Sequence, residues 1–140
     1  MNRLTALLSL CHYAAMKTCI QASDAPAAIG PYSQAVKAGN TLYISGQVPL
    51  DPATGKLVEG DIRVQTERVM RNIGAILNSA GYDFGDVVKS TCLLTSMADF
   101  QGMNEVYAWF FPEAPPARVS YAVAELPLGA RIEIETIAVR

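Results

Sequence analysis

The chain has 140 residues, of which 51% are apolar by a broad count and 17% are charged, a composition typical of one compact globular domain with a sizeable core. The net charge is −2 and the 11 basic residues are scattered, so the clustered Lys and Arg that mark a nucleic-acid partner are not expected. The three cysteines, Cys11, Cys19 and Cys92, form no CxxC pair, and the one histidine, His12, cannot supply a His-rich cluster, so neither a disulfide framework nor a metal site is expected.

Residues 1–15 form a separate N-terminal extension. They contain one basic residue, Arg3, no acidic residue and a short apolar run, which fits a weak targeting peptide. Met16 follows directly, and an upstream start or a tail is the favoured explanation, because one arginine is few for a transit peptide. The apolar run is too short to span a bilayer, and no membrane partner is expected. We therefore expect a domain over residues 16–140 in the cytoplasm, with a mitochondrion or another organelle as the alternative if residues 1–15 act as a targeting segment.

The first part of the domain is rich in residues that favour strands. Residues 16–20 predict a first strand, which a polar stretch follows. Residues 41–47 are rich in β-forming residues and have a glycine near their end, and residues 51–56 contain the Pro and Gly of a turn. This pattern predicts a strand followed by an exposed loop.

A helix is predicted over residues 61–80. Asp61 is placed to cap its first turn, and Gly81 is placed to end it. Apolar residues recur between these two positions at the spacing of one helix face, namely at Val69, Met70, Ile73, Ile76, Leu77 and Ala80.

The remaining elements are strands and one more helix. Residues 87–94 are rich in Val, Thr and Leu and predict a buried strand. Residues 96–99 resemble a capping box with Asp in place of Glu, and the helix that they begin should end near Phe111, before Pro112. Two final strands are predicted, over residues 117–125 and 131–139. This order predicts an α+β fold, with a sheet covered by two helices.

Two charged residues, Arg118 and Glu133, stand in the mostly apolar final strands. A guanidinium can hold a planar carboxylate by two parallel hydrogen bonds, and a carboxylate beside it can take a proton from water. The combination suggests a hydrolase for a small acid. On the pattern alone, however, charges that alternate outward along a solvated sheet edge are the more common explanation.

The alternation of side chains along a strand predicts the neighbours of both residues. Arg118 should share a face with the small residues Ser120, Ala122 and Ala124, where a pocket could form. On the last strand, Glu133 should share a face with two other charged residues, Arg131 and Glu135, while Ile132 and Ile134 face the core.

Three further polar residues are weak candidates for site residues when each is considered alone. Asn104 lies in the apolar stripe of the second helix, where its amide needs a partner, and a satisfied structural amide is as good an explanation as a site residue. Tyr32 follows Gly30-Pro31 and Ser45 precedes Gly46, positions where turn residues with local hydrogen bonds are common.

Five ordered motifs nevertheless resemble the reactive intermediate deaminase (RidA, also YjgF) family over nearly the whole chain from Met16 onward. The motifs are Ala27-Ala28-Ile29-Gly30-Pro31-Tyr32-Ser33-Gln34-Ala35, Ser45-Gly46-Gln47, Asn104-Glu105-Val106-Tyr107, Pro116-Ala117-Arg118 and Ile132-Glu133-Ile134-Glu135-Thr136-Ile137-Ala138-Val139. The resemblance implies a chorismate-mutase-like fold, in which two helices cover one face of a mixed sheet. It also implies a homotrimer with three active sites in clefts between subunits.

The resemblance further implies hydrolysis of reactive 2-enamine and 2-imino acids, such as 2-iminobutanoate and 2-iminopropanoate, to 2-keto acids and ammonia. By position in the motifs, Arg118 should bind the substrate carboxylate, and Glu133, rather than Glu135, should orient and deprotonate the attacking water. The other substrate-binding positions would be Tyr32, Ser45, Gly46, Asn104 and Ser120. An imine carbon is already electrophilic, so no metal or organic cofactor is expected.

One position departs from the family pattern. The deaminase group often has Cys two residues after the clamping Arg, where this chain has Ser120. If that position acts through its backbone carbonyl, the exchange should be tolerated, whereas a role for the thiol would be lost. Cys92, on a central strand, fits a small core residue better than a replacement nucleophile.

Three functions from different classes stay open at this point. An imine deaminase requires both Arg118 and Glu133. An endoribonuclease or translation inhibitor, an activity ascribed to some relatives of the family, is disfavoured by the acidic charge balance. A non-catalytic binder of small acids, or a chaperone-like trimer, would need Arg118 without Glu133.

Overall fold

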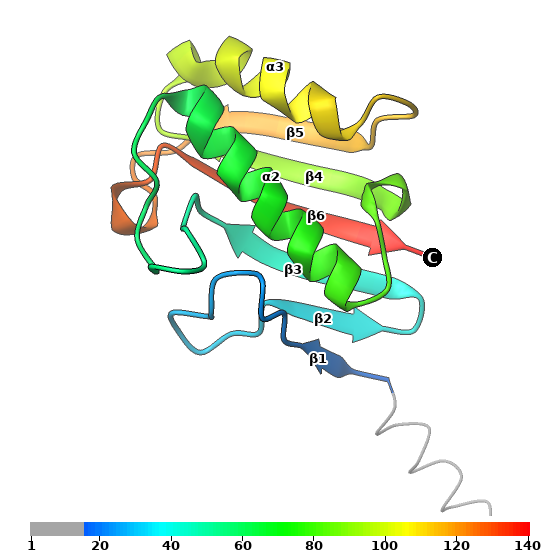
Figure 1. Ribbon diagram of the computed structural model, residues 1–140. Coiled ribbons are helices and arrows are strands. Elements are labelled where there is room, and N and C mark those ends of the chain that lie inside the picture. The colour runs from blue at the N-terminus through cyan, green and yellow to red at the C-terminus, as the bar shows by residue number, and fades with distance from the viewer. Residues whose placement is uncertain (1–15) are drawn as a thin grey trace, which may run out of the picture.

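The structure, a computed structural model, describes residues 16–140, so the predicted extension over residues 1–15 lies outside the described residues. Six strands form one sheet in the order β1-β2-β3-β6-β4-β5, in which β4 and β5 run parallel and every other pair is antiparallel. The strands are β1 (Thr18–Ile20), β2 (Ala35–Ala38), β3 (Thr41–Gln47), β4 (Val87–Leu94), β5 (Ala117–Ala122) and β6 (Ile132–Val139). Both helices, α2 (Ile62–Ser79) and α3 (Phe100–Phe110), lie on one face of the sheet (Figure 1). The predicted mixed sheet with two helices on one face is confirmed.

Alternation along β6 divides the sheet into a core face and an open face. Ile132, Ile134, Thr136 and Ala138 are buried, and the residues between them are half-buried or exposed. The buried set faces α2 and α3, because Ile132, Ile134 and Ala138 belong to the same core cluster as the apolar residues of both helices. The opposite face, which neither α2 nor α3 covers, carries the exposed hydrophobic residues Tyr43, Val88, Val119, Tyr121 and Val139.

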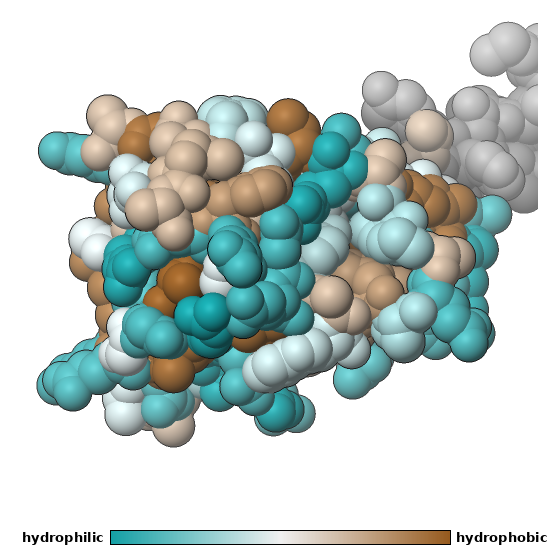
Figure 2. Space-filling view, turned by 90° about the horizontal axis from the view of Figure 1, so that it is seen from above, coloured by the Kyte–Doolittle hydropathy of each residue, from teal (hydrophilic) through white to brown (hydrophobic). Residues whose placement is uncertain are grey.

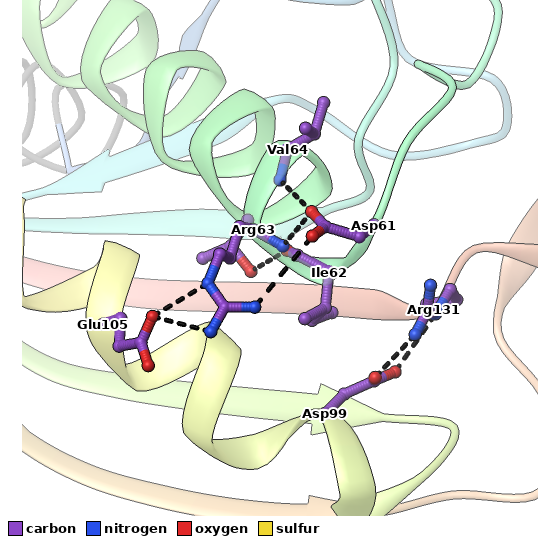
Figure 3. Close-up of polar contacts among 8 residues, drawn as sticks. Asp61, Ile62, Arg63, Val64, Asp99, Glu105 and Arg131 are labelled. Carbon is purple, nitrogen blue, oxygen red and sulfur yellow. Dashed lines mark hydrogen bonds and ion pairs between the residues drawn. The ribbon is translucent and has the colours of Figure 1, made fainter.

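The helix α2 begins and ends as its sequence predicts. The Asp61 carboxylate accepts hydrogen bonds from the backbone N–H groups of Arg63 and Val64, at 3.0 and 3.2 Å (Figure 3). Gly81 adopts a φ of +79° directly after the helix, a conformation that glycine reaches without steric cost. The buried side chains of α2 follow the predicted apolar face.

The two helices approach each other closely near the start of α2. A Cβ atom at Gly102 of α3 would lie 2.6 Å from Cγ2 of Ile62, so only glycine fits there without displacement. Next to this contact, the Arg63 guanidinium forms an ion pair with Glu105 at 2.8 Å (Figure 3).

Viewed from the side of α3 and β5, the surface carries small groups of hydrophobic residues between hydrophilic ones (Figure 2).

The structure corrects several predicted boundaries. The four-residue strand β2, which pairs with β3, was not predicted from the sequence. The strand β5 ends at Ala122 instead of Glu125, and α3 follows a 3₁₀ turn over Met97–Asp99 and ends one residue before Phe111. The strand β6 starts at Ile132, one residue after the predicted start.

The predicted capping box at Ser96 is wrong in its acidic half. The Ser96 hydroxyl accepts a hydrogen bond from the backbone N–H of Ala98, as a cap should. The Asp99 carboxylate instead accepts two hydrogen bonds from the Arg131 guanidinium, at 2.6 and 3.1 Å (Figure 3). A bidentate ion pair between segments far apart in the sequence is stronger than a local bond to one N–H group.

Within residues 16–140, neither helix is both long and apolar enough to cross a membrane.

Candidate active site

Four of the predicted site residues come together in one pocket. Tyr32, Ser45, Gly46 and Glu133 line a cavity of about 230 Å³, together with the apolar residues Ile29, Val48 and Pro127. A larger hollow of about 560 Å³ beside it shares only Tyr32 with the predicted set and contains no carboxylate. We therefore take the smaller cavity, which contains Glu133, as part of the candidate site.

A β-bulge places Ser45 and Gly46 beside Glu133. Ile44 pairs with Thr136 and Gln47 pairs with Ile134, so two residues of β3 stand opposite the single residue Glu135 of β6. The Ser45 hydroxyl donates a hydrogen bond to the carbonyl of Ser33 at 2.6 Å, which ties the bulge to the segment that carries Tyr32. Ser45 is therefore held in place by its own hydrogen bond, as a turn residue would be.

Gly46 leaves the space that the Glu133 carboxylate occupies. A Cβ atom at position 46 would collide with Oε1 of Glu133 and would lie 2.9 Å from its Cδ. Burial raises the pKa of Glu133 above its ordinary value, and the nearby charge of Glu135 raises it further. Within residues 16–140 the carboxylate forms no ion pair, so it is free to accept a proton.

The segment that carries Tyr32 is held by a residue to which the sequence analysis assigned no role. The buried Gln34 side chain accepts a hydrogen bond from the N–H of Ala22, and its amide nitrogen donates to the carbonyls of Ala22, Ala25 and Pro26. Its backbone carbonyl also accepts from the N–H of Ser45 at 3.0 Å. Gln34 stands within the motif around Tyr32, but nothing in its local pattern distinguishes such a clamp from a surface glutamine.

The other three predicted residues lie elsewhere, around α3. The Arg118 guanidinium lies over the rings of Tyr107 and Phe100, at 4.8 and 5.6 Å from their centroids. It forms no ion pair with any carboxylate of the described residues. Its surroundings thus differ from the small-residue pocket that the sequence predicts, because two aromatic residues of α3 contact the cation and Ala124 lies beyond the end of β5.

Asn104 and Ser120 present polar atoms that lack partners. Asn104 occupies the α3 face between Phe100 and Tyr107, and its Oδ1 is buried without a hydrogen bond within the described chain. The same holds for Oγ of Ser120, which lies two residues after Arg118 on β5. Buried polar atoms are nearly always hydrogen-bonded, so both point to a ligand, a water molecule or a second chain as the missing partner.

The backbone N–H and C=O groups of Ser120 point away from β4, toward the outer edge of the sheet. The N–H of Val123 donates to the carbonyl of Leu94 at 2.8 Å, so Val123 directs its backbone groups toward β4. Backbone groups alternate along a strand, and Ser120 therefore directs its own toward the open edge of β5. The Ser120 carbonyl therefore points away from the hydrogen bonds with β4, and the expectation that serine is tolerated at this position stays a prediction.

Cys92 has the properties of a core residue. It is fully buried, and burial raises the pKa of its thiol to about 11, although the nearby Arg118 and Ser120 act in the opposite direction. A thiol with such a pKa is protonated at neutral pH and is a poor nucleophile. The Ser120 hydroxyl lies near this thiol without reaching hydrogen-bond geometry.

The two groups of site residues lie on opposite faces of the sheet. Arg118 is in register with Ser90, whereas Glu133 is in register with Leu93. Residues three apart on a strand point to opposite faces, and residues in register share a face. Within one chain, therefore, the Glu133 carboxylate does not lie beside the Arg118 guanidinium. Among residues 16–140, no group of three or more His, Cys, Asp or Glu side chains is arranged to hold a metal ion.

Comparisons with known proteins identify relatives that match most of this chain. The family model described as Endoribonuclease L-PSP matches residues 22–140. A RutC family protein of Pyrococcus horikoshii is 56% identical over 123 residues, which cover 88% of this chain and 98% of that protein. The 2-iminobutanoate/2-iminopropanoate deaminase of Mus musculus is 53% identical over 121 residues, which cover 86% and 90%.

The fold is shared with solved structures as well. The crystal structure of RidA from an Antarctic Psychrobacter bacterium superposes with a TM-score of 0.85 at 49% sequence identity, and the match covers 88% of this chain and 99% of that one. The order of strands, the bulge beside Glu133 and the arginine over α3 thus occur in a chain that resembles curated deaminases over most of its length. The chain belongs to the RidA/YjgF family, which the family model describes as Endoribonuclease L-PSP.

Proposed function

We propose that this protein hydrolyses reactive 2-enamine and 2-imino acids, such as 2-iminobutanoate and 2-iminopropanoate, to 2-keto acids and ammonia, and so protects against metabolite damage. The observation that carries the proposal is the Arg118 guanidinium, which has no acidic partner among residues 16–140, in the same chain as a half-buried carboxylate, Glu133, whose pKa is raised. The deaminase names of curated relatives support it.

Arg118 would bind the substrate carboxylate by two parallel hydrogen bonds and so fix the position of the imine carbon. Glu133 would orient a water molecule and take its proton as the oxygen attacks C2, which forms a tetrahedral carbinolamine. The protonated Glu133 would then return this proton to the amine nitrogen. As the C=O bond re-forms, Glu133 takes the hydroxyl proton of the carbinolamine and passes it to the departing nitrogen, which leaves as ammonia, so one imine and one water give one keto acid and one ammonia. A carboxyl whose pKa is raised is suited to both proton transfers.

The remaining site residues would bind and orient the substrate. Asn104 Oδ1 can accept a hydrogen bond from the imine N–H, and the Ser120 carbonyl can contact the same nitrogen or the water. Ser45 and Gly46 would form the floor beside Glu133, and Tyr32 the wall of the pocket. None of these steps calls for a cofactor, and the prediction of none stays a prediction.

Because Arg118 and Glu133 lie on opposite faces of one sheet, a complete site requires a second copy of the chain. We propose a homotrimer in which each site combines Glu133 of one subunit with Arg118 of its neighbour. The hydrophobic residues on the open face of the sheet, Tyr43, Val119 and Tyr121 among them, supply apolar surface that such an assembly would cover. The prediction of a cytoplasmic location, with an organelle as the alternative, stays a prediction.

Endoribonuclease activity is a second candidate, favoured by the description of the family model. The chain carries a net charge of −2, which gives little attraction for an RNA backbone. A non-catalytic binder of small acids, or a chaperone-like trimer, would use the same cleft through Arg118 without needing Glu133.

The test is release of ammonia and 2-oxobutanoate from 2-iminobutanoate that threonine dehydratase generates in situ. The wild-type protein should accelerate release, and Arg118→Ala and Glu133→Ala should each abolish the acceleration while both variants stay folded and keep the oligomeric state of the wild type. An inactive wild-type protein would contradict the deaminase function. Activity that survives Glu133→Ala would favour another base, and cleavage of a single-stranded RNA probe would support the endoribonuclease instead.

A further inference from the structure

The surroundings of Arg118 show how this side chain is kept available for an anion. An arginine whose ligand is absent usually pairs with a nearby carboxylate, which then competes with the ligand for the same N–H groups. Within residues 16–140 Arg118 has no such partner, and its closest defined contacts are the rings of Tyr107 and Phe100. A guanidinium that lies over a ring is held by the ring's electrons and keeps its in-plane N–H donors free.

Tyr107 is itself fixed at both ends. Its hydroxyl donates a hydrogen bond to Oγ of Ser90 at 2.9 Å, and its ring packs against Phe111 with centroids 4.8 Å apart. Ser90 is fully buried and stands directly in register with Arg118 on the neighbouring strand. Burial raises the pKa of Tyr107, so its hydroxyl remains a donor at neutral pH. The ring is therefore a rigid surface over which the guanidinium can lie.

We infer that Tyr107 is a positioning residue that fixes the Arg118 guanidinium in the orientation that receives the substrate carboxylate. The inference rests on the proposed function, because that function assigns the carboxylate to Arg118. A free arginine side chain has many rotamers, and ordering it on binding weakens affinity. The Tyr107 ring removes that cost in advance, whereas the Tyr107 hydroxyl acts only by holding the ring on Ser90.

The prediction separates the ring from the hydroxyl. Tyr107→Leu removes the ring and should weaken binding of 2-oxobutanoate, the product used as a carboxylate probe, by about 5- to 30-fold, together with a similar rise in KM for the imine. Tyr107→Phe keeps the ring, loses only the bond to Ser90 and should stay within about threefold of wild type in both quantities. Once the substrate is bound, kcat should change little in either variant, because Tyr107 does not touch the reacting atoms.

The experiment measures 2-oxobutanoate affinity by titration calorimetry and steady-state kinetics with 2-iminobutanoate, for the full chain in its native oligomeric state. Tyr107→Leu is also combined with Arg118→Ala. Because Tyr107 acts through Arg118, it should have no further effect on affinity in that background. Phe100→Leu, which removes the more distant ring, is a second variant should Tyr107→Leu fail to fold. It should weaken binding of 2-oxobutanoate by no more than about fivefold.

Each outcome decides the matter. Weakened binding in Tyr107→Leu that Tyr107→Phe restores and that vanishes without Arg118 supports the inference. Unchanged affinity in Tyr107→Leu, or effects that add in the Arg118→Ala background, overturns it. A wild-type protein that binds 2-oxobutanoate without deaminating the imine contradicts the proposed function alone, and one that binds no carboxylate contradicts both.

Discussion

Arg118 and Glu133, which would bind and hydrolyse one substrate, point to opposite faces of the same sheet. The intervening strand β4 fixes this relation, because Arg118 pairs with Ser90 and Glu133 pairs with Leu93, three residues further along. No rotation of either side chain carries it through the sheet. In the proposed mechanism each chain therefore supplies two separate halves of a site, and catalysis depends on assembly.

This relation predicts that two inactive variants restore activity to each other. Arg118→Ala and Glu133→Ala chains carry different intact halves, so a mixed trimer contains sites with both halves intact. If the chains bear different tags and only mixed trimers are purified, about one site in three should be active. As the control, each single variant is mixed with chains that carry both substitutions, and these trimers contain no site with both halves intact. Mixed trimers as inactive as their parents would place the complete site within one chain.

Gly46→Ala should remove activity while leaving the fold intact. The added methyl group would occupy the position of the Glu133 carboxylate, with 2.9 Å to Cδ, and would push the carboxylate from its place in the pocket. A displacement of about 1 Å can lower catalysis by about a hundredfold, so we expect a loss of that size in kcat/KM. Gly74→Ala on α2, away from both halves of the site, is the matched control and should keep its activity. Wild-type activity in Gly46→Ala would show that Glu133 does not act from this position.

The pH dependence of activity should report the raised pKa of Glu133. Glu133 must be ionised to take a proton, so activity should rise with pH through that pKa. Glu135→Gln removes a nearby negative charge, lowers the pKa of Glu133 and should move the acid limb of the pH profile to lower pH. Glu59→Gln, an equal change of charge on an exposed loop, should leave the limb in place. If Glu135→Gln does not move the acid limb, the limb reports the titration of a group other than Glu133.

The same pKa predicts an effect on stability. A carboxyl whose pKa is higher in the folded state favours folding when it is protonated, and this contribution is present below the pKa of the unfolded chain and is lost as pH rises through the folded value. Glu133→Gln should therefore raise the midpoint of thermal unfolding at neutral pH, and the difference from wild type should shrink in acid. A variant that is less stable than wild type at neutral pH would contradict this sign.

Local patterns in the sequence predicted most of the helices and strands, whereas the relative position of the site residues depends on pairing between strands that are far apart in the sequence. The helix over residues 61–80 was predicted within one residue of its ends, because its apolar spacing and the Asp61 cap are local. The strand β2 was missed because four residues carry too little pattern, and its strand character comes from pairing with β3. The open-face position of Glu133 follows from the isoleucines beside it, but its relation to Arg118 depends on β4 lying between β5 and β6, which no local pattern specifies.

Gln34 should be the residue on which the Tyr32 segment depends most. Its amide nitrogen donates to three carbonyls, the nearest that of Pro26 at 2.7 Å, so Gln34→Glu would place an oxygen against three acceptors. We expect a loss of about 2 kcal/mol or more in the free energy of unfolding, faster hydrogen exchange of the amides between residues 22 and 32, and a higher KM. Ser79→Ala, which removes one exposed hydrogen bond to the neighbouring Gln21, should cost less than about 0.5 kcal/mol. Equal losses in the two variants, measured by chemical denaturation, would show that the segment does not depend on this clamp.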